Sequence, residues 1–190
     1  MTELFARIPE DRIGVVIGAD GVTKKAIEER SGTSLKIDVD DYSVSITSPA
    51  KSDPWMAMKA RDVVLAIGRG FSPERAFRLF KGETYLTILD MKDVTGKRNK
   101  AAMRRIRSRL IGTAGKARAR IEQLSGCLVS VYGTHVALIG TAEQLERGTR
   151  AMTMLLRGSE HSTVFGFLEG ARRRDIPDEG PEGGIEDKDL

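Results

Sequence analysis

The alternation of apolar and polar residues predicts the same series of elements twice along the chain. A short alternating segment, typical of a strand, opens each copy at Leu4–Ile8 and at Tyr85–Leu89. Two helical segments, two further strands and a closing helix follow in each copy, in the order β-α-α-β-β-α. Because three strands packed on three helices form a sandwich, the predicted fold class is α+β with two such units in tandem.

The remaining segments are predicted from the same patterns and from turn and capping residues. They are expected at 12–17, 22–30, 35–39 and 42–46 in the first copy, and at 104–111, 116–124, 129–131 and 135–139 in the second. The closing helix is expected to begin near Ser52-Asp53-Pro54 and at Thr141, because these residues cap a helix or fit its first turn. The apolar face of the helix in 22–30 is expected at Val22, Ala26 and Ile27.

A direct sequence repeat supports a duplication. Residues 17–32 read IGADGVTKKAIEERSG and residues 111–126 read IGTAGKARARIEQLSG, and seven of these sixteen positions are identical at a constant offset of 94 residues. The following strands keep the pattern with a shift of two residues. Glu28 and Glu122 recur after an apolar isoleucine in a helix, so they are predicted to be structural or solvent-facing rather than acid–base groups.

Each copy holds a Gly-x-x-Gly loop between its first two helices, at Gly18–Gly21 and Gly112–Gly115. Two glycines three residues apart allow a tight turn and let another backbone approach closely. The first turn of the next helix points unpaired N–H groups and the positive end of its dipole at the loop, which favours phosphate. One isolated loop of this kind is usually a helix connection without a ligand, but its recurrence in the same context favours phosphate binding.

The isoleucine-glycine-x-x-glycine loop between two helices resembles the mark of the KH family in its eukaryotic-type (type I) arrangement. In that family the loop clamps about four backbone nucleotides. The segments RLIGTAGKARARIEQLSGCLVSVYGTHVALIG and VFGFLE look like the second KH domain of the archaeal double-KH ribosomal RNA-processing proteins. Their eukaryotic relatives are the small-subunit assembly factors known as partner of Nob one and Krr one. The resemblance covers roughly residues 3–170.

The resemblance implies a protein that holds single-stranded RNA, 16S ribosomal RNA, during small-subunit maturation. It also implies partners such as a processing nuclease or a translation initiation factor. One alternative is therefore a scaffold that docks such a protein, with RNA contact secondary. Another is a binder of single-stranded DNA, because the sequence does not show whether 2′-hydroxyl groups are read.

The predicted organisation is a first KH domain at 1–70, a helical linker at 71–82, a second KH domain at 83–170 and an acidic disordered tail at 171–190. The linker is read as a short capped helix with Phe77 and Phe80 on one side, either packed rigidly between the domains or exposed as a platform for bases. Residues 1–80 carry 12 basic and 12 acidic side chains, whereas residues 81–174 carry 18 basic and 8 acidic ones. The tail from Asp175 carries 1 basic and 7 acidic side chains. A basic unit of this kind indicates a surface for a polyanion.

The second copy is predicted to bind most of the RNA, because residues 97–120 hold ten basic side chains and no acidic one. A stripe at Ala102, Ile106 and Leu110 is expected to face the core, which turns the arginines outward. The backbone is expected over the glycine loop, with Lys116 and Arg109 on phosphates and with Ile111, Ile121 and Val129 lining the base groove. The predicted RNA-binding residues of this copy are Arg105, Arg109, Ile111, Gly112, Thr113, Ala114, Gly115, Lys116, Arg118, Ile121 and Val129.

The first copy is expected to make weaker RNA contact or to dock a protein, because its loop holds Asp20 where phosphates should lie. Nearby cations offset this acid in part. The predicted RNA-binding residues of this copy are Arg12, Ile17, Gly18, Ala19, Gly21, Lys24 and Lys25.

The sequence predicts neither catalysis nor a metal or cofactor site. Cys127 lies in an apolar run and is expected to be a buried thiol in a reducing compartment. His135 and His161 have no metal-ligand spacing to it, and no P-loop, nucleophile elbow or dinucleotide motif occurs. No apolar run is long enough to cross a membrane and no signal peptide is recognised, so a cytoplasmic protein without membrane contact is expected.

Overall fold

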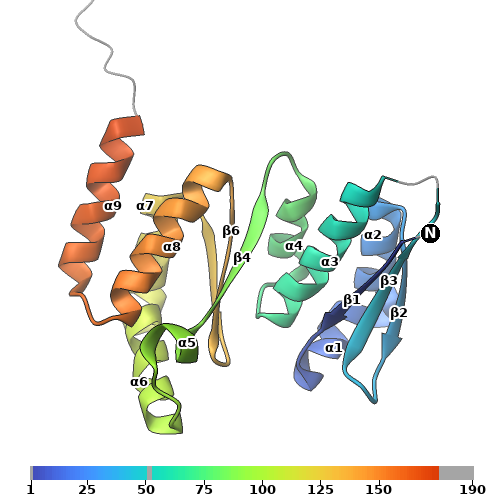
Figure 1. Ribbon diagram of the computed structural model, residues 1–190, viewed down its shortest axis with the longest axis horizontal. Coiled ribbons are helices and arrows are strands. Elements are labelled where there is room, and N and C mark those ends of the chain that lie inside the picture. The colour runs from blue at the N-terminus through green and yellow to red at the C-terminus, as the bar shows by residue number, and fades with distance from the viewer. Residues whose placement is uncertain (1, 51–52, 176–190) are drawn as a thin grey trace, which may run out of the picture.

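The computed structural model describes residues 2–50 and 53–175, which form two α+β domains in tandem, as predicted (Figure 1). In each domain a three-stranded antiparallel sheet places the last strand in the middle, with the order β1-β3-β2 in the first and β4-β6-β5 in the second. The first domain contains β1 (Thr2–Arg7), α1 (Glu10–Ile17), α2 (Val22–Ser31), β2 (Ser34–Asp38), β3 (Ser43–Ser48) and α3 (Pro54–Gly68). The second contains β4 (Tyr85–Asp90), α5 (Met91–Thr95), α6 (Lys100–Ile111), α7 (Lys116–Ser125), β5 (Leu128–Tyr132), β6 (His135–Gly140), α8 (Ala142–Leu156) and α9 (His161–Asp175).

Two elements of the second domain were not predicted, the short helix α5 and the long C-terminal helix α9. Helix α9 continues to Asp175, past residue 171, so the expected start of a disordered tail at 171 is wrong. The rest of the predicted tail, 176–190, lies outside the described residues. Helix α9 packs against α7 and α8, and it is therefore part of the folded second domain.

The repeated Ile-Glu-x-x-Ser-Gly motif fixes the second helix of each domain to the next strand. Oε1 of Glu28 accepts a hydrogen bond from the backbone N–H of Leu35 at 2.7 Å, and Oε1 of Glu122 accepts one from Val129 at 2.6 Å. The serine hydroxyl that follows donates to the carbonyl of the isoleucine four residues earlier, at 2.7 Å in both copies. The prediction that Glu28 and Glu122 are structural is confirmed.

The capping residues predicted for the closing helices are also confirmed. The side chain of Asp53 accepts a hydrogen bond from the N–H of Trp55 at the start of α3, and Pro54 occupies the first helical position. At the start of α8, Thr141 and Gln144 form a reciprocal capping box. The apolar face predicted for α2 is wrong at one position, because Val22 is 63% exposed.

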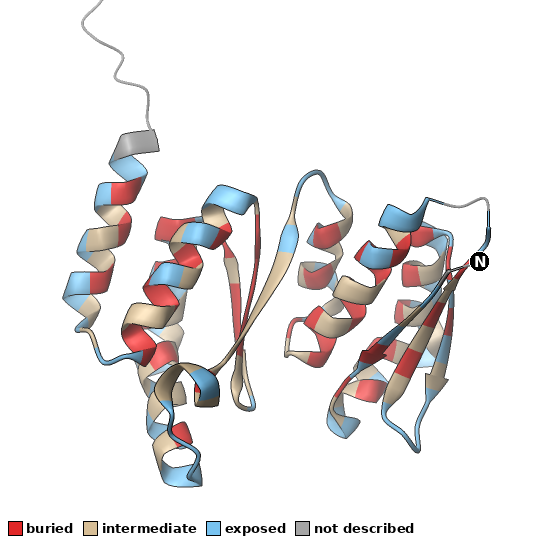
Figure 2. Cartoon of the chain, viewed as in Figure 1, coloured by how far each residue is buried: buried red, intermediate tan, exposed pale blue. Residues whose placement is uncertain are grey.

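The two sheets differ in what covers their outer faces. Strand β3 is buried at alternate positions, whereas β6 is buried at every position after His135 (Figure 2). Strands β4 and β6 lie between the helices of their own domain and helices α3 and α4 (Pro73–Ala76) (Figure 1). Ala137 and Ile139 accordingly belong to the core of the first domain, while Val136 and Leu138 belong to their own. The first domain therefore covers the second sheet, and the two domains share a core.

The segment between the domains is a packed linker. Ser72 caps α4 by accepting from the N–H of Arg75, and Arg75 forms an ion pair with Glu122 of the second domain. Phe77 lies in the 3₁₀ turn that follows and packs against the core, with the guanidinium of Arg30 over its ring at 4.5 Å. Phe77 is therefore packed against the core and is not part of an open platform for bases.

Candidate nucleic-acid interface

The two Gly-x-x-Gly loops have the same backbone conformation. The first glycine has φ 76° at Gly18 and 72° at Gly112, and the second has φ 76° at Gly21 and 75° at Gly115. The residue before the second glycine is also left-handed in both loops, with φ 51°. The positive φ angles of the first and second glycine are strongly favoured by glycine over other residues, which explains why both glycines recur in the repeat.

The first glycine is also required by close packing. A Cβ atom on Gly112 would lie 2.7 Å from the Cβ of Ala117 and 2.9 Å from its backbone nitrogen. A Cβ on Gly115 would meet nothing within 4 Å. The loop therefore turns tightly into α7 and carries exposed side chains only at Thr113 and Ala114.

Helix α7 begins directly at the end of this loop and has no side-chain cap. The N–H of Gly115 donates to the carbonyl of Gly112 and the N–H of Lys116 donates to that of Thr113, so the N–H groups that follow in the first turn remain for a ligand. The helix dipole places positive charge at this end. A strand of nucleic acid that crosses the loop would find backbone donors for its phosphates. Loop and helix together therefore have the geometry that favours an anion.

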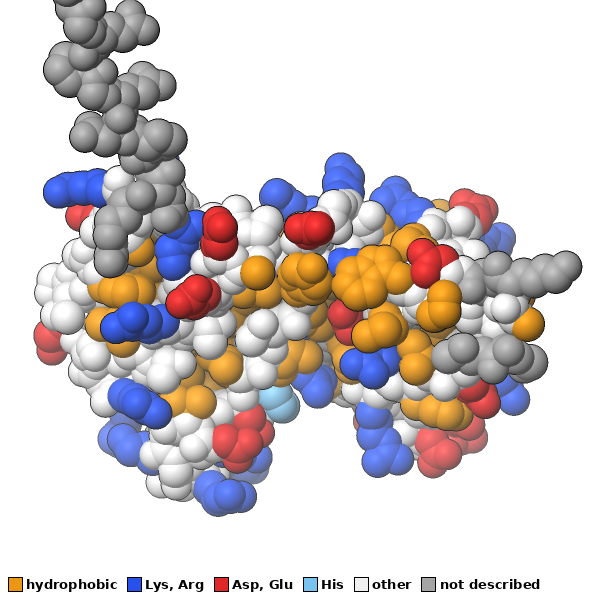
Figure 3. All heavy atoms as spheres, turned by 45° about the horizontal axis from the view of Figure 1, so that its top comes forward, with side chains coloured by type: hydrophobic (Ala, Val, Ile, Leu, Met, Phe, Trp, Pro, Cys, Tyr) orange, Lys and Arg blue, Asp and Glu red, His pale blue; other side chains and the backbone are white. Residues whose placement is uncertain are grey.

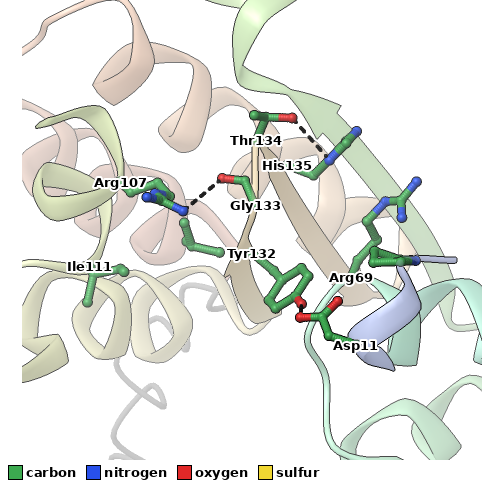
Figure 4. Close-up of a pocket in the computed structure, with 10 residues that line it drawn as sticks. Asp11, Arg69, Arg107, Ile111, Tyr132, Gly133, Thr134 and His135 are labelled. Atoms are coloured by element: carbon green, nitrogen blue, oxygen red, sulfur yellow. Dashed lines mark hydrogen bonds between the residues drawn. The ribbon is translucent and has the colours of Figure 1, made fainter. Parts of the chain in front are cut away.

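A groove lies beside the loop of the second domain, and the molecule is notched between its two domains (Figure 3). The groove has a volume of about 610 Å³ and lies between α6, the β5–β6 hairpin and the first domain (Figure 4). Its lining residues are Pro9, Asp11, Arg69, Arg107, Ile111, Val131, Tyr132, Gly133, Thr134 and His135.

The first domain supplies one wall of this groove. The hydroxyl of Tyr132 donates a hydrogen bond to Asp11, the second residue of α1 (Figure 4). The guanidinium of Arg12 lies 5.6 Å from the centre of the Tyr132 ring. On the opposite wall, Nη1 of Arg107 donates to the carbonyl of Gly133 at 3.4 Å. The groove thus combines apolar surface at Ile111 with fixed polar groups.

His135 lies at the hairpin end of the groove. Burial lowers the pKa of its imidazole, and the positive charge of Arg69 lowers it further. The carboxylate of Asp90, whose Oδ2 lies 3.8 Å from Nε2 of His135, acts in the opposite direction. Because the net shift is downward, the fold favours the neutral imidazole.

The equivalent groove of the first domain has a different charge. It has a volume of about 590 Å³ and is lined by Glu10, Ile13, Gly14, Ile17, Val39, Asp40 and Tyr42. Two carboxylates and no cation line it, whereas two arginines and one carboxylate line the groove of the second domain. The negative charge of Glu10 raises the pKa of Tyr42. This groove is therefore poorly suited to a polyanion.

The surface leading to the second loop is strongly basic. Lys97, Arg98, Lys100, Arg104 and Arg105 are exposed, and none of them forms an ion pair with a carboxylate among residues 2–50 and 53–175. The predicted core stripe of α6 is confirmed at Leu110, which is fully buried, and at Ile106, which packs against the core.

The structure brings most of the predicted residues of the second domain to the loop and the groove. Ile111 lines the groove, and Thr113 and Ala114 are exposed on the loop. Arg105 is exposed on α6, and Nε of Arg118 is buried without a hydrogen-bond partner among the described residues.

Two predicted groove residues are wrong. The side chains of Ile121 and Val129 have no exposed surface and belong to the core of the second domain. They therefore cannot contact a base in this structure.

Two predicted arginines are committed to the protein itself. Arg12 donates to the carbonyls of Ile67 and Phe71 at 2.8 Å, which ties α1 to the end of α3. Arg109 donates to the carbonyls of Gly158 and Ser159, ahead of α9. Arg12 was predicted to contact RNA and Arg109 to bind phosphate, and in the structure both side chains also hold elements of the fold together.

The other predicted RNA-binding residues of the first domain do not gather at one site. Ile17 lines the acidic groove, and Lys24 lies 4.0 Å from Glu28 in an i,i+4 pair. Ala19 and Lys25 are exposed.

Sequence reasoning missed several groove residues, namely Arg69, Tyr132, Thr134 and Asp11. Tyr132 and Thr134 flank the hairpin turn at Gly133, and their nearness to the loop follows from the KH order of elements. Arg69 and Asp11 have no local signal, because only the packing of the first domain brings them there.

Among the described residues, no group of three or more histidine, cysteine or acidic side chains is arranged to hold a metal ion. No helix in the described part of the chain is both long and apolar enough to cross a bilayer. Cys127 is buried, and burial raises the pKa of its thiol to about 11, which makes it a poor nucleophile.

Family models match both domains. A model described as a eukaryotic-type KH domain (KH-domain type I) matches residues 85–173, and a KH-domain model matches residues 2–54. A KH domain-containing protein of Methanocaldococcus jannaschii is 43% identical over 168 residues, which cover 88% of this chain and 73% of that protein. The pre-rRNA-processing protein pno1 of Emericella nidulans is 24% identical over 142 residues, covering 74% of this chain and 55% of that protein.

Solved structures show the same fold in the same arrangement. Dim2p from Pyrococcus horikoshii superposes with a TM-score of 0.84 at 47% identity, covering 90% of this chain and 99% of that one. A chain in an a/eIF2alpha–aDim2p–rRNA complex from the same organism gives a TM-score of 0.85 at 46% identity, covering 91% and 95%. Two type I KH domains, a matched relative over most of its length and this shared architecture place the chain in the Dim2 and Pno1 family of double-KH proteins.

Proposed function

We propose that the protein binds single-stranded 16S ribosomal RNA during maturation of the small ribosomal subunit, and that its second KH domain makes the main contact. The observation that carries this proposal is that the glycine loop joins the basic helix α6 to a helix without a side-chain cap, directly after Ile111 of an open, partly apolar groove. The relatives point the same way, since one is named a pre-rRNA-processing protein and another was solved with rRNA.

The proposed binding mode follows from the chemistry of the groove. The backbone of the strand crosses Gly112–Gly115, where the N–H groups at the start of α7 meet its phosphates. The bases turn into the groove against Ile111, and the polar groups of Arg107 and Asp11 meet their edges. Sequence-specific recognition of single-stranded RNA generally uses hydrogen bonds to the edges of unstacked bases.

The first domain acts mainly as a wall and a support in this proposal. It contributes Asp11 and Arg69 to the groove and covers the outer face of the second sheet. Its own groove carries Glu10 and Asp40, which repel phosphate. Its loop also carries the carboxylate of Asp20 at the crest.

The proposal is tested by placing carboxylates on the second loop without disturbing its backbone. Aspartate at Gly112 would clash with Ala117, so the exposed positions are the better choice. The variant Thr113→Asp/Ala114→Asp is expected to fold normally, because Asp20 already occupies the position equivalent to Ala114 with the same φ. Its affinity for single-stranded fragments of 16S ribosomal RNA, measured by fluorescence anisotropy, should fall at least about tenfold, because two carboxylates oppose the phosphates.

The matched control is Ala19→Asp in the first loop, which produces the same pair of adjacent acids there. It should bind the same fragments with nearly unchanged affinity. If the double variant of the second loop binds as tightly as the natural protein, or if Ala19→Asp is equally damaging, the second domain is not the main site.

A specific surface feature favours a second candidate function, the docking of a protein partner. Trp55 and Met58 of α3 and Tyr85 of β4 are exposed, and apolar side chains gather across the junction of the domains (Figure 3). The rings of Trp55 and Tyr85 meet edge to face at 6.2 Å, and Lys59 lies close to both of them. Exposed apolar clusters of this kind often mark protein interfaces.

The second candidate is tested with the initiation-factor subunit named in the relative's complex. If the surface docks that partner, Trp55→Ser/Tyr85→Ser should weaken binding of purified a/eIF2alpha and leave RNA affinity unchanged. Equal binding by the variant and the natural protein would exclude this surface as the docking site.

A further inference from the structure

A second cavity lies at the Gly-x-x-Gly loop of the second domain and has no lining residue in common with the groove. It has a volume of about 590 Å³ and lies between α7 and the additional helix α9. Its lining residues are Gly112, Thr113, Lys116, Ala117, Arg120, His161 and Phe165. Two of them, Gly112 and Thr113, belong to the loop itself and directly follow Ile111, which lines the groove.

Helix α9 is held against the loop by specific contacts. Nη2 of Arg109, at the end of α6, donates to the carbonyl of Gly158 at 3.0 Å and also to that of Ser159. In return, Nε2 of His161 lies 2.9 Å from the carbonyl of Arg109, and it must be the donor because a carbonyl only accepts. These bonds fix the first turn of α9 beside the loop, and they give the arginine a role in building the cavity.

The residues of the cavity combine aromatic rings with cations. The rings of His161 and Phe165 lie 6.0 Å apart at 46°. Lys116 is exposed and forms no ion pair with a carboxylate in the described part of the chain. Arg120 is held in place by Glu169 of α9 at 2.7 Å and by Gln123 of α7 at 3.1 Å.

This combination matches the chemistry of a nucleotide. Unstacked bases are bound on the faces of phenylalanine and histidine rings, and phosphates are bound by exposed lysine. The volume falls within the range of pockets that hold small organic ligands. The cavity is also continuous with the turn over which the proposed RNA backbone passes, so a strand that leaves the loop enters it directly.

We propose that this cavity binds one further nucleotide of the RNA strand, next to the segment held in the groove, with its base on Phe165 and its phosphate near Lys116. The inference rests on the proposed function, because it extends the same strand across the same loop. It assigns to α9 a direct part in RNA binding and lengthens the footprint of the second domain beyond the groove.

The test compares two phenylalanines on the same helix. Phe165 lines the cavity, whereas Phe167 lies away from it with the guanidinium of Arg150 over its ring at 4.8 Å. Both pack against the same core and both are half-buried. The variants Phe165→Leu and Phe167→Leu therefore make the same chemical change with similar effects on packing, but only the first removes a ring from the cavity.

Affinity is measured by fluorescence anisotropy for labelled pools of random-sequence RNA, one of tetranucleotides and one of octanucleotides. Phe165→Leu should weaken octanucleotide binding at least about fivefold, because stacking on an aromatic ring is lost. It should leave tetranucleotide binding unchanged, since a strand of that length fills only the groove. Phe167→Leu should change neither affinity.

Three results would overturn the inference: octanucleotide binding unchanged in Phe165→Leu, equal losses in both variants, or an equal loss of both oligonucleotides in Phe165→Leu. The proposed function fails separately, when fragments of 16S ribosomal RNA are not bound by the natural protein or are bound as tightly by Thr113→Asp/Ala114→Asp. Thermal melting of each variant confirms that the comparison is made between folded proteins.

Discussion

The residue before the second glycine of each loop has a left-handed backbone although it is not glycine. It is Asp20 in the first domain and Ala114 in the second. The two loops share their backbone angles, so the duplication kept the geometry of the turn. What differs is the charge presented to a phosphate. The carboxylate of Asp20 thus adds to the acidic lining of the first groove in making the first loop less suited to a polyanion than the second.

The sequence identified the residues whose role depends on local backbone geometry, such as Gly112 and Gly115. It did not separate groove from core at Ile121 and Val129, because helical and strand periodicity shows only that a side chain faces inward. It also missed that Arg12 and Arg109 are used internally. Their partners are backbone carbonyls about 50 or more residues away, and no local pattern reveals such contacts.

His135 makes the stability of the fold depend on pH. Its pKa is lower in the folded state than the ordinary value of about 6.5, so the unfolded chain binds more protons below that value. The free energy of unfolding should therefore be highest above about pH 6.5 and fall as the pH drops through the range below it. Urea titrations at several pH values should show this slope, and His135→Gln should make it shallower. An unchanged slope in the variant would mean that His135 does not contribute.

Among the elements, strand β6 differs from its counterpart β3 because its outer face packs against the other domain. It reads HVALIG where β3 reads SVSITS, so apolar residues replace the polar outward positions. Ala137 and Ile139 fill those positions and pack into the core of the first domain. The loss of alternation was visible in the sequence, and it indicates a strand covered on both faces. What covers it could not be read from the pattern.

The contribution of the contact between the domains to the free energy of unfolding is predicted from two equivalent positions, one in each sheet. Ile139 of β6 pairs with the second residue of β4, just as Thr47 of β3 pairs with the second residue of β1. Ile139→Ala should lower the free energy of unfolding by about 2–4 kcal/mol, because it leaves a cavity between the domains. Thr47→Ala should cost roughly 0.5–1 kcal/mol, since its side chain is only half-buried in an outer face. Equal losses in urea unfolding would contradict the shared core.

Across the whole molecule, the two domains form one unit with a composite groove. The order of elements, the duplication and the concentration of positive charge in residues 81–174 followed from the sequence. The packing of the first domain against the second sheet did not, and neither did the docking of α9 beside the loop. These two packing arrangements depend on contacts between segments far apart in the chain. The packing of the first domain adds Asp11 and Arg69 to the groove, and the docking of α9 forms the second cavity.

The most direct test of the central claim is a map of the RNA contact on the full chain. Ultraviolet crosslinking to 16S ribosomal RNA, followed by identification of crosslinked peptides by mass spectrometry, would supply it. The account predicts crosslinks in α6, in the loop Gly112–Gly115 and in the hairpin around Gly133, with few in the loop Gly18–Gly21. Crosslinks concentrated in the first domain, with none around Gly112–Gly115, would contradict it.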